Sequence, residues 1–185
     1  MDKRPLWAII PAKGNSRRCP GKNAKLAPYV IRAAVEAKCF DRVIVSSDDV
    51  DILENAMMLG AETFQRAPIL CEDGVTAAMV VADVLACNYY ACRSFALLWP
   101  TNPLIMPKTL NLITHAFLHV NNEHAYAEST AVYMTTNLFI RAPHFRVPIL
   151  NRENMWLPIP FEENIDVNEP EDLARAEAIL ASRNR

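Results

Sequence analysis

The sequence predicts an α/β protein with a Rossmann-like, open and mostly parallel sheet flanked by helices. Short apolar runs of the kind that form buried strands alternate with segments whose apolar residues recur at helical spacing. The first run, residues 6–10, is continuously apolar, which is typical of a parallel strand covered on both faces. With 185 residues the chain can form one domain with a full core, so we expect a single domain over residues 1–185.

Apolar spacing and helix-end residues place the individual elements. Pro28 suits the first turn of a helix, Asp73 suits a helix N-cap, and Gly60 suits a helix end. Strands are expected at residues 6–10, 42–47, 61–65, 95–99 and 131–134, with short pieces near Val147 and Trp156. Helices are expected at residues 28–40, 52–59, 75–90 and 108–120 and after residues 165–169, whereas residues 121–126 are expected to be irregular.

Composition narrows the function to the handling of a small molecule. The 19 basic and 21 acidic residues nearly cancel, which argues against a nucleic-acid partner. The five cysteines form no Cys-x-x-Cys pair, so we expect reduced thiols in a cytoplasmic protein. The first apolar stretch is too short for a signal peptide, and no stretch approaches the ~20 apolar residues of a membrane span, so no membrane is expected.

The loop that follows the first strand, residues 12–23, has the composition of a phosphate-binding site. Glycines allow backbone N–H groups to approach phosphate oxygens, and cationic side chains neutralise the phosphate charge. Besides Gly14 and Gly21, the loop contains four such cations, Lys13, Arg17, Arg18 and Lys22. It lacks the Gly-Lys-Ser/Thr ending of a P-loop, and a solvated basic loop is the alternative interpretation.

Residues 10–23, Ile-Pro-Ala-Lys-Gly-Asn-Ser-Arg-Arg-Cys-Pro-Gly-Lys-Asn, carry a family resemblance. They resemble the Ile-Pro-Ala-Arg-x-x-Ser-Lys-x-x-Pro-x-Lys-Asn signature of the acylneuraminate cytidylyltransferases, which join CTP to sialic acid and related 2-keto sugar acids. The resemblance continues in order through residues 40–49, 60–62, 66–68, 97–104, 165–173 and 176–177. It implies a nucleotidyltransferase in which a sugar hydroxyl attacks the α-phosphorus of CTP and pyrophosphate leaves.

The resemblance also implies roles for individual residues. Lys13, Arg17 and Lys22 would be the catalytic cations that hold the triphosphate, and Lys22 is expected to be a loop cation without core packing. Asp166 and Asn168 would hold a divalent metal, Mg²⁺ or Mn²⁺. The remaining nucleotide-binding residues would be Ala12, Gly14, Asn15, Ser16, Asn23 near the ribose or base, Arg66, Thr76, Ala77 and Trp99.

Several departures from the family pattern fall inside this expected site. Lys13 replaces an arginine, Trp99 replaces a glutamine, and Asn168 replaces the second metal-binding aspartate. The segment before Ala131 is much shorter than in the family, where it contributes to the sugar-acid pocket and to dimer formation. We therefore expect the usual dimer element to be absent, although the sequence remains compatible with a homodimer.

The departures keep two alternatives open. One is a nucleotide-binding homologue that has lost catalysis, and the other is a transferase for another nucleoside triphosphate or sugar. Among weaker motifs, His115 and His119 have zinc-compatible spacing but lack a third ligand, which favours surface histidines. The acidic run at residues 46–49 fits a helix N-cap and a metal cluster equally well.

Overall fold

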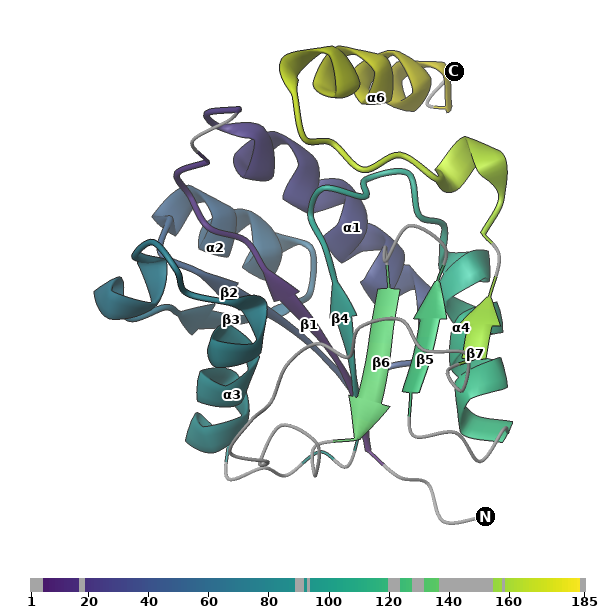
Figure 1. Ribbon diagram of the computed structural model, residues 1–185, viewed down its shortest axis with the longest axis horizontal. Coiled ribbons are helices and arrows are strands. Elements are labelled where there is room, and N and C mark those ends of the chain that lie inside the picture. The colour runs from purple at the N-terminus through teal and green to yellow at the C-terminus, as the bar shows by residue number, and fades with distance from the viewer. Residues whose placement is uncertain are drawn as a thin grey trace.

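The computed structural model describes residues 5–16, 19–88, 92, 94–119, 124–127, 132–136, 155–157 and 159–183. Its strands form one seven-stranded sheet in the order β3-β2-β1-β4-β6-β5-β7 (Figure 1). The strands are β1 (Leu6–Pro11), β2 (Arg42–Ser47), β3 (Glu62–Gln65), β4 (Ser94–Leu98), β5 (His124–Ala127), β6 (Val132–Thr136) and β7 (Met155–Leu157). The helices are α1 (Lys22–Ala37), α2 (Val50–Met58), α3 (Ala77–Cys87), α4 (Pro107–His119) and α6 (Pro170–Arg183), with short 3₁₀ turns η1 (Pro68–Cys71) and η3 (Phe161–Glu163).

The sheet is mostly parallel, as the sequence predicts. β1 pairs in parallel with both β2 and β4, and β2 pairs in parallel with β3. β6 runs antiparallel to its neighbours β4 and β5, and β7 is again parallel to β5. The predicted Rossmann-like class is therefore confirmed. Because β1 to β4 run in the same direction, the loops that follow them meet at one edge of the sheet.

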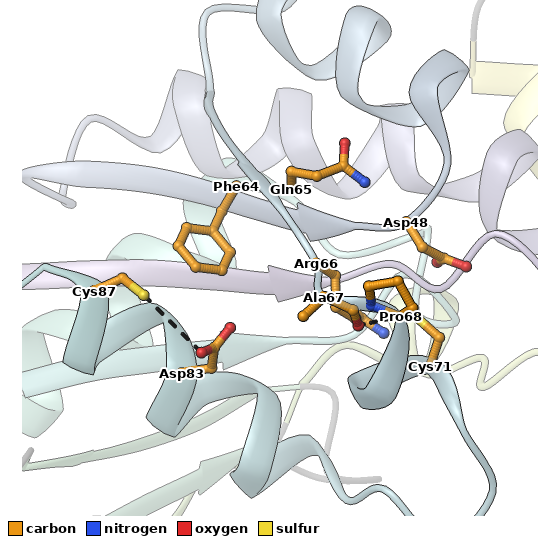
Figure 2. Close-up of a pocket in the computed structure, with 9 residues that line it drawn as sticks. All are labelled: Asp48, Phe64, Gln65, Arg66, Ala67, Pro68, Cys71, Asp83 and Cys87. Atoms are coloured by element: carbon orange, nitrogen blue, oxygen red, sulfur yellow. Dashed lines mark hydrogen bonds between the residues drawn. The ribbon is translucent and has the colours of Figure 1, made fainter.

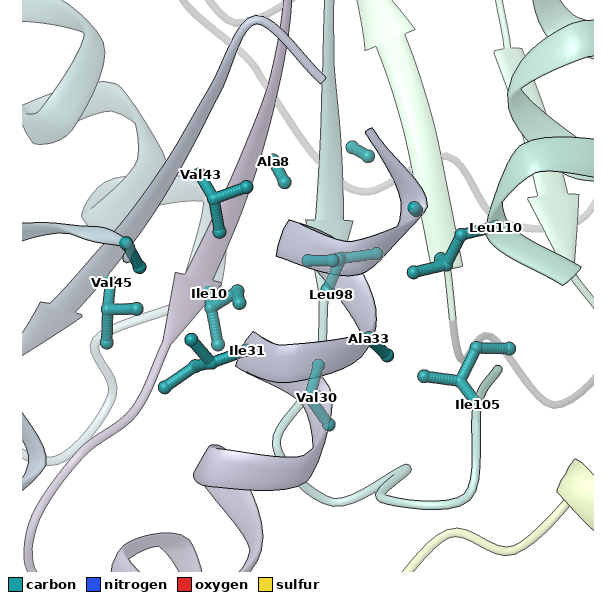
Figure 3. Packing of buried hydrophobic residues seen from close by; sticks show 14 of the residues in the cluster. Ala8, Ile10, Val30, Ile31, Ala33, Val43, Val45, Leu98, Ile105 and Leu110 are labelled. Carbon is teal, nitrogen blue, oxygen red and sulfur yellow. The ribbon is translucent and has the colours of Figure 1, made fainter. Parts of the chain in front are cut away.

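Helices cover both faces of the sheet, and β1 explains why. Its side chains are all buried, so alternate residues must pack on opposite sides. Ala8 and Ile10 join a cluster with residues of α1, α2 and α4, whereas Trp7 and Ile9 join a cluster with α3. Figure 3 shows Ile10 and Val45 beside Ile31 of α1 in the first of these clusters.

The C-terminal helix has a packing cluster of its own. Ala176 and Leu180 of α6 lie with Ile165 and Val167 from the segment before it, and with Leu26 from the second turn of α1. In Figure 1 the segment that leads into α6 crosses the upper edge of the sheet, above the arrowhead of β4. This crossing brings residues near the C-terminus to the edge where the site is expected.

The structure corrects three sequence-based placements. α1 begins at Lys22 and contains Pro28, because Gly21 turns the chain with φ 74° and its carbonyl accepts the Lys25 N–H at 3.2 Å. α3 begins after Thr76 and not after Asp73, since the Thr76 hydroxyl accepts the Met79 N–H at 3.3 Å. The irregular structure expected at residues 121–126 was wrong where His124–Ala127 forms β5, because pairing with β6 and β7 makes a strand that the polar residues before it do not predict.

The other placements agree closely with the structure. The strand expected near Trp156 is β7, and the last helix runs from Pro170 to Arg183. The strand expected near Val147, the helix end at Tyr90 and the residue Ala131 lie outside the described residues. None of the helices in the described part of the chain combines the length and the apolar character that a membrane crossing requires.

Candidate functional site

The ends of β1, β2 and β3 are fastened to one another at the carboxyl edge of the sheet. The Ala12 N–H donates to the carbonyl of Ser46 at 2.9 Å, and the Arg66 N–H donates to the carbonyl of Ser47 at 2.8 Å. These bonds continue the parallel ladders by one step beyond the strands. The start of the predicted phosphate loop, the acidic run and the segment after β3 are thus neighbours.

Gly14 is required where the loop crosses the end of β2. Its N–H donates to Oδ1 of Asp48 at 2.9 Å, and a Cβ at this position would lie 2.7 Å from the Cβ of Asp49. Asp49 is the N-cap of α2, since its carboxylate accepts the Ile52 N–H at 3.2 Å. The N-cap alternative for the acidic run is confirmed for Asp49, and the described residues contain no group of three His, Cys, Asp or Glu side chains able to hold a metal.

The Asp48 carboxylate is held in its ionised form by its neighbours. Burial acts to raise the pKa of Asp48, but donation from the Gly14 N–H and its own N–H, with the nearby Cys71 thiol and the charge of Arg66, outweighs burial. The pKa of Asp48 therefore lies below its usual value. Burial and the Asp48 carboxylate together raise the pKa of Cys71, so this thiol stays protonated, and its Sγ donates to the carbonyl of Ala67 at 3.7 Å.

Arg66 is buried beneath this edge, with 4% of its surface exposed. Its Nη2 donates to the carbonyl of Ser46 at 2.7 Å, and its Nε lies 3.4 Å from the Ser46 hydroxyl. Burial lowers the pKa of Arg66, but the guanidinium remains protonated because its ordinary pKa is far above neutrality. The cation therefore supports the end of β2 and lies next to Asp48.

Two adjoining pockets open around Asp48 and Cys71, which line both of them. The larger, of about 740 Å³, extends from these two residues to Phe64, Asp83 and Cys87 (Figure 2). The smaller, of about 630 Å³, is lined by Lys13, Asn15, Asp48, Cys71, Glu72 and Asp73. The expected nucleotide residues Lys13, Asn15 and Arg66 thus surround one hollow region.

The first turn of α1 carries the next two expected residues. The Asn23 amide donates to the carbonyl of Lys13 at 2.7 Å, and its buried Oδ1 finds no hydrogen-bond partner among the described residues. Lys22 is 5% exposed, and its Nζ donates to the carbonyl of Val167 at 2.8 Å. The expectation of a loop cation without packing was wrong for Lys22, because the earlier start of α1 buries it between two parts of the chain.

Asp166 and Asn168 lie on either side of Val167, beside this lysine. The Asn168 amide donates to Oδ2 of Asp166 at 2.9 Å, which leaves the Asn168 carbonyl oxygen outside that bond. The N–H groups of Glu169 and Asn168 hold the pKa of Asp172 below its usual value and fix the start of α6. One carboxylate and one amide carbonyl fit a Mg²⁺ ion that takes its other ligands from phosphates and water.

The structure thus brings most of the expected residues to one edge, in two groups. Lys13, Gly14, Asn15 and Arg66 surround Asp48, while Lys22, Asp166 and Asn168 lie at the C-terminal segment, and the Asn23–Lys13 bond connects the groups. Arg17 and Arg18 lie outside the described residues. The remaining expected residues lie elsewhere along the chain. Ala12 and Ser16 lie in the loop after β1, and Thr76 and Ala77 lie at the N-terminus of α3. Trp99 packs against the apolar cluster beneath α3.

The two residues that line both pockets were not predicted as site residues from the sequence. Asp48 was identified only as part of an acidic run, and Cys71 only as one of five cysteines. No local sequence pattern connects Asp48 and Cys71 with Gly14 or Arg66. The parallel pairing of β1, β2 and β3 is what brings them together.

The class of protein follows from comparison with known families. Residues 7–144 match the family described as Cytidylyltransferase. This match covers well over half of the 185 residues, so the chain belongs to the cytidylyltransferase family.

Individual relatives carry more specific names. The chain is 30% identical over 141 residues to a pseudaminic acid cytidylyltransferase of Campylobacter jejuni, an alignment that covers 71% of this chain and 61% of that protein. It is 32% identical over 116 residues to a CMP-N,N'-diacetyllegionaminic acid synthase of Legionella pneumophila, covering 57% of this chain and 50% of that protein. The matches therefore span less than two thirds of these relatives.

Solved structures agree on the fold. The structure of a CMP:2-keto-3-deoxy-manno-octonic acid synthetase complexed with CTP has a TM-score of 0.73 at 12% identity, covering 97% of this chain and 99% of that one. A 4-diphosphocytidyl-2C-methyl-D-erythritol synthase from Anaerococcus prevotii has a TM-score of 0.70 at 13% identity, covering 97% of this chain and 100% of that one. At such identities the likeness shows the architecture alone.

The lowered pKa of Asp48 predicts a pH dependence of stability. A carboxyl whose pKa is lower in the folded state stabilises that state above its unfolded pKa of ~3.9, and this contribution is lost as pH falls through the folded pKa. Asp48→Asn should therefore be less stable than wild type at pH 7 and approach it below about pH 4. Urea denaturation from pH 7 downward measures this, with exposed Glu54→Gln on α2 as the control. A constant difference at all pH values would contradict the assignment.

Proposed function

We propose that this protein transfers CMP from CTP to a nonulosonic, sialic acid-like or related 2-keto sugar acid and releases pyrophosphate. The observation that carries the proposal is the buried Lys22–Val167 hydrogen bond. It places the loop that resembles the family signature directly beside Asp166 and Asn168. Cations that face a carboxylate and an amide carbonyl, which together would hold a metal ion, are an arrangement that such a transfer could use.

The reaction depends chiefly on alignment and charge. An oxygen of the sugar acid forms a bond to the α-phosphorus of CTP while the bond from that phosphorus to the bridging oxygen of pyrophosphate breaks. The hydroxyl proton passes to a base or to solvent. Lys13, Arg17 and Lys22 would neutralise the triphosphate, and the Gly14 segment would bring backbone to the phosphates.

A divalent ion fits the second wall of this site, which is the side formed by Asp166 and Asn168. Asp166 and Asn168 would hold Mg²⁺ or Mn²⁺, which when bound would add positive charge against the phosphates. Lys22 would lie between that wall and the loop, because its ammonium reaches the carbonyl of Val167.

The Asn23 oxygen, which has no hydrogen-bond partner within the described part of the chain, supports a polar ligand at this edge. A buried acceptor without a donor is costly, so a hydroxyl or amino group of a bound nucleotide would stabilise it. This agrees with the role proposed for Asn23 near the ribose or base.

One observation favours a second candidate, a transferase that uses another nucleoside triphosphate. Trp99 follows β4, and its partly buried side chain packs with the cluster beneath α3. An aromatic residue where the family carries an amide changes how the edge of a base would be recognised. Thermal shift with each of the four ribonucleoside triphosphates separates the candidates, because a ligand at 100 times its Kd stabilises by ~2.7 kcal/mol.

The acceptor is tested by a screen for pyrophosphate release. With CTP and Mg²⁺, the protein should release pyrophosphate when supplied with sialic, legionaminic, pseudaminic or shorter 2-keto acids, and at least one acid should exceed the no-acid background clearly. CTP replaced by ATP, GTP or UTP is the control. A flat response to every acid, with folded protein that still binds CTP, would refute the transferase activity and leave a binding homologue.

The second wall is tested by restoring a carboxylate. Asn168→Asp removes the amide that donates to Asp166 and places two carboxylates side by side, so the metal-free protein should be destabilised. Mg²⁺ should then raise its melting temperature more than that of wild type, whereas Asp166→Ala should lose the metal response. Identical Mg²⁺ titrations for wild type and both variants would remove Asp166 and Asn168 from the site.

A further inference from the structure

A buried asparagine connects the turn after β4 to the C-terminal segment. Asn102 is 2% exposed, and its Nδ2 donates to the carbonyl of Ile165 at 3.0 Å, across 63 positions of sequence. Its own N–H donates to the carbonyl of Trp99 at 3.1 Å, which fixes the turn. The asparagine is thus held at both its backbone and its side chain.

Hydrogen bonds to distant parts of the chain hold the residues on both sides of Asp166. The Val167 N–H donates to the carbonyl of Thr101 at 2.8 Å, and the Val167 carbonyl accepts from Lys22 Nζ at 2.8 Å. With the Asn102–Ile165 bond, three hydrogen bonds hold the residues immediately before and after Asp166. Its backbone cannot shift without breaking at least one of them.

Burial fixes the direction of the side chains in this segment. Ile165 is 7% exposed and Val167 is fully buried, and both pack against Leu26 and Leu180. Asp166 is exposed and Asn168 is half-buried, so the alternating residues project away from this apolar cluster. The Asn168 amide then meets Asp166 at 2.9 Å.

The residues that lead into this segment are anchored to the same turn. Glu163 is 5% exposed and accepts the Met106 N–H at 2.8 Å and the Thr109 hydroxyl at 2.9 Å. Arg183 of α6 donates to the carbonyls of Leu104 at 2.8 Å and Glu162 at 3.0 Å. The whole segment is therefore docked on the residues that follow β4.

We propose that Asn102 is a positioning residue that sets where the Asp166 carboxylate and the Asn168 carbonyl stand for a metal–nucleotide complex. This inference rests on the proposed function, since it assigns a task within that same site. Asn102 itself would touch neither metal nor nucleotide. It acts through the Ile165 carbonyl, one residue from Asp166.

The test removes the Asn102 side-chain donor. Asn102→Asp places an oxygen against the Ile165 carbonyl, and Asn102→Ser removes the reach of the side chain, which gives a second variant should the first fold poorly. Asn111→Asp, at an exposed asparagine, is the control. The Asn111 amide also donates to a distant carbonyl, that of Ala37 at 2.9 Å, but on α4 and away from residues 165–168.

Two measurements are made on each variant. Amide hydrogen exchange at Val167, without ligand, reports how firmly residues 165–168 are held. The affinity for Mn²⁺ in the presence of CTP, measured by electron paramagnetic resonance, reports whether Asp166 and Asn168 are placed to hold the metal. For the Asn102 variants we expect about tenfold faster exchange and about tenfold weaker Mn²⁺ binding, given the usual cost of a lost buried hydrogen bond. Asn111→Asp should match wild type in both.

The outcomes are separable. Unchanged Val167 exchange in the Asn102 variants would overturn the inference, and so would faster exchange with unchanged Mn²⁺ affinity, because the bond would then be structural only. If wild type itself binds no Mn²⁺ with CTP, the proposed function fails and the positioning role falls with it. That result appears in wild type before any variant is compared.

Discussion

The buried hydrogen bond from Lys22 Nζ to the Val167 carbonyl joins the first helix of the chain to the segment before its last helix. A lysine ammonium in the first turn of a helix is unfavourably placed, because the N-terminal end of the helix dipole is positive. The Val167 carbonyl and the nearby Asp172 carboxylate offset this cost. Without these partners, burying the ammonium would be expensive, so the two parts of the chain depend on each other.

The parallel sheet positions the other group of site residues. Because β1, β2 and β3 end at the same edge, Gly14, Asp48 and Arg66 come together although they are distant in sequence. Gly14 allows the loop to pass Asp49 at a distance that no Cβ could tolerate. The Asp48 carboxylate then receives the Gly14 N–H and lies near the Arg66 charge. The predicted phosphate loop is thus held by the ends of its neighbouring strands.

Much of the fold could be predicted because the apolar runs that form β1, β2 and β4 are buried on both faces and have few alternatives. Helix starts were predicted less well. Pro28 suggested a first turn, but Gly21 adopts the left-handed conformation that begins α1 earlier, and Thr76 caps α3 in place of Asp73. β5 depends on pairing with distant strands, which local composition does not reveal.

For the site, residue types indicated the chemistry, but only the tertiary structure could show which residues are already engaged. The cations and glycines of residues 12–23 indicated phosphate binding. The burial of Lys22, the Asp48–Gly14 bond and the docking of Ile165 on Asn102 all join residues far apart in sequence. No periodicity or local motif encodes such contacts.

The most direct test of this account is the CTP affinity of Lys22→Met, measured by calorimetry together with the free energy of unfolding. Methionine keeps much of the apolar length of lysine but removes the ammonium. The matched control is Lys25→Met on the same helix, where the exposed Lys25–Glu177 ion pair at 3.4 Å also links α1 to α6. We expect Lys22→Met to lose about 1–3 kcal/mol of stability and at least tenfold in CTP affinity, and Lys25→Met to change little. Wild-type CTP affinity in Lys22→Met would contradict the account.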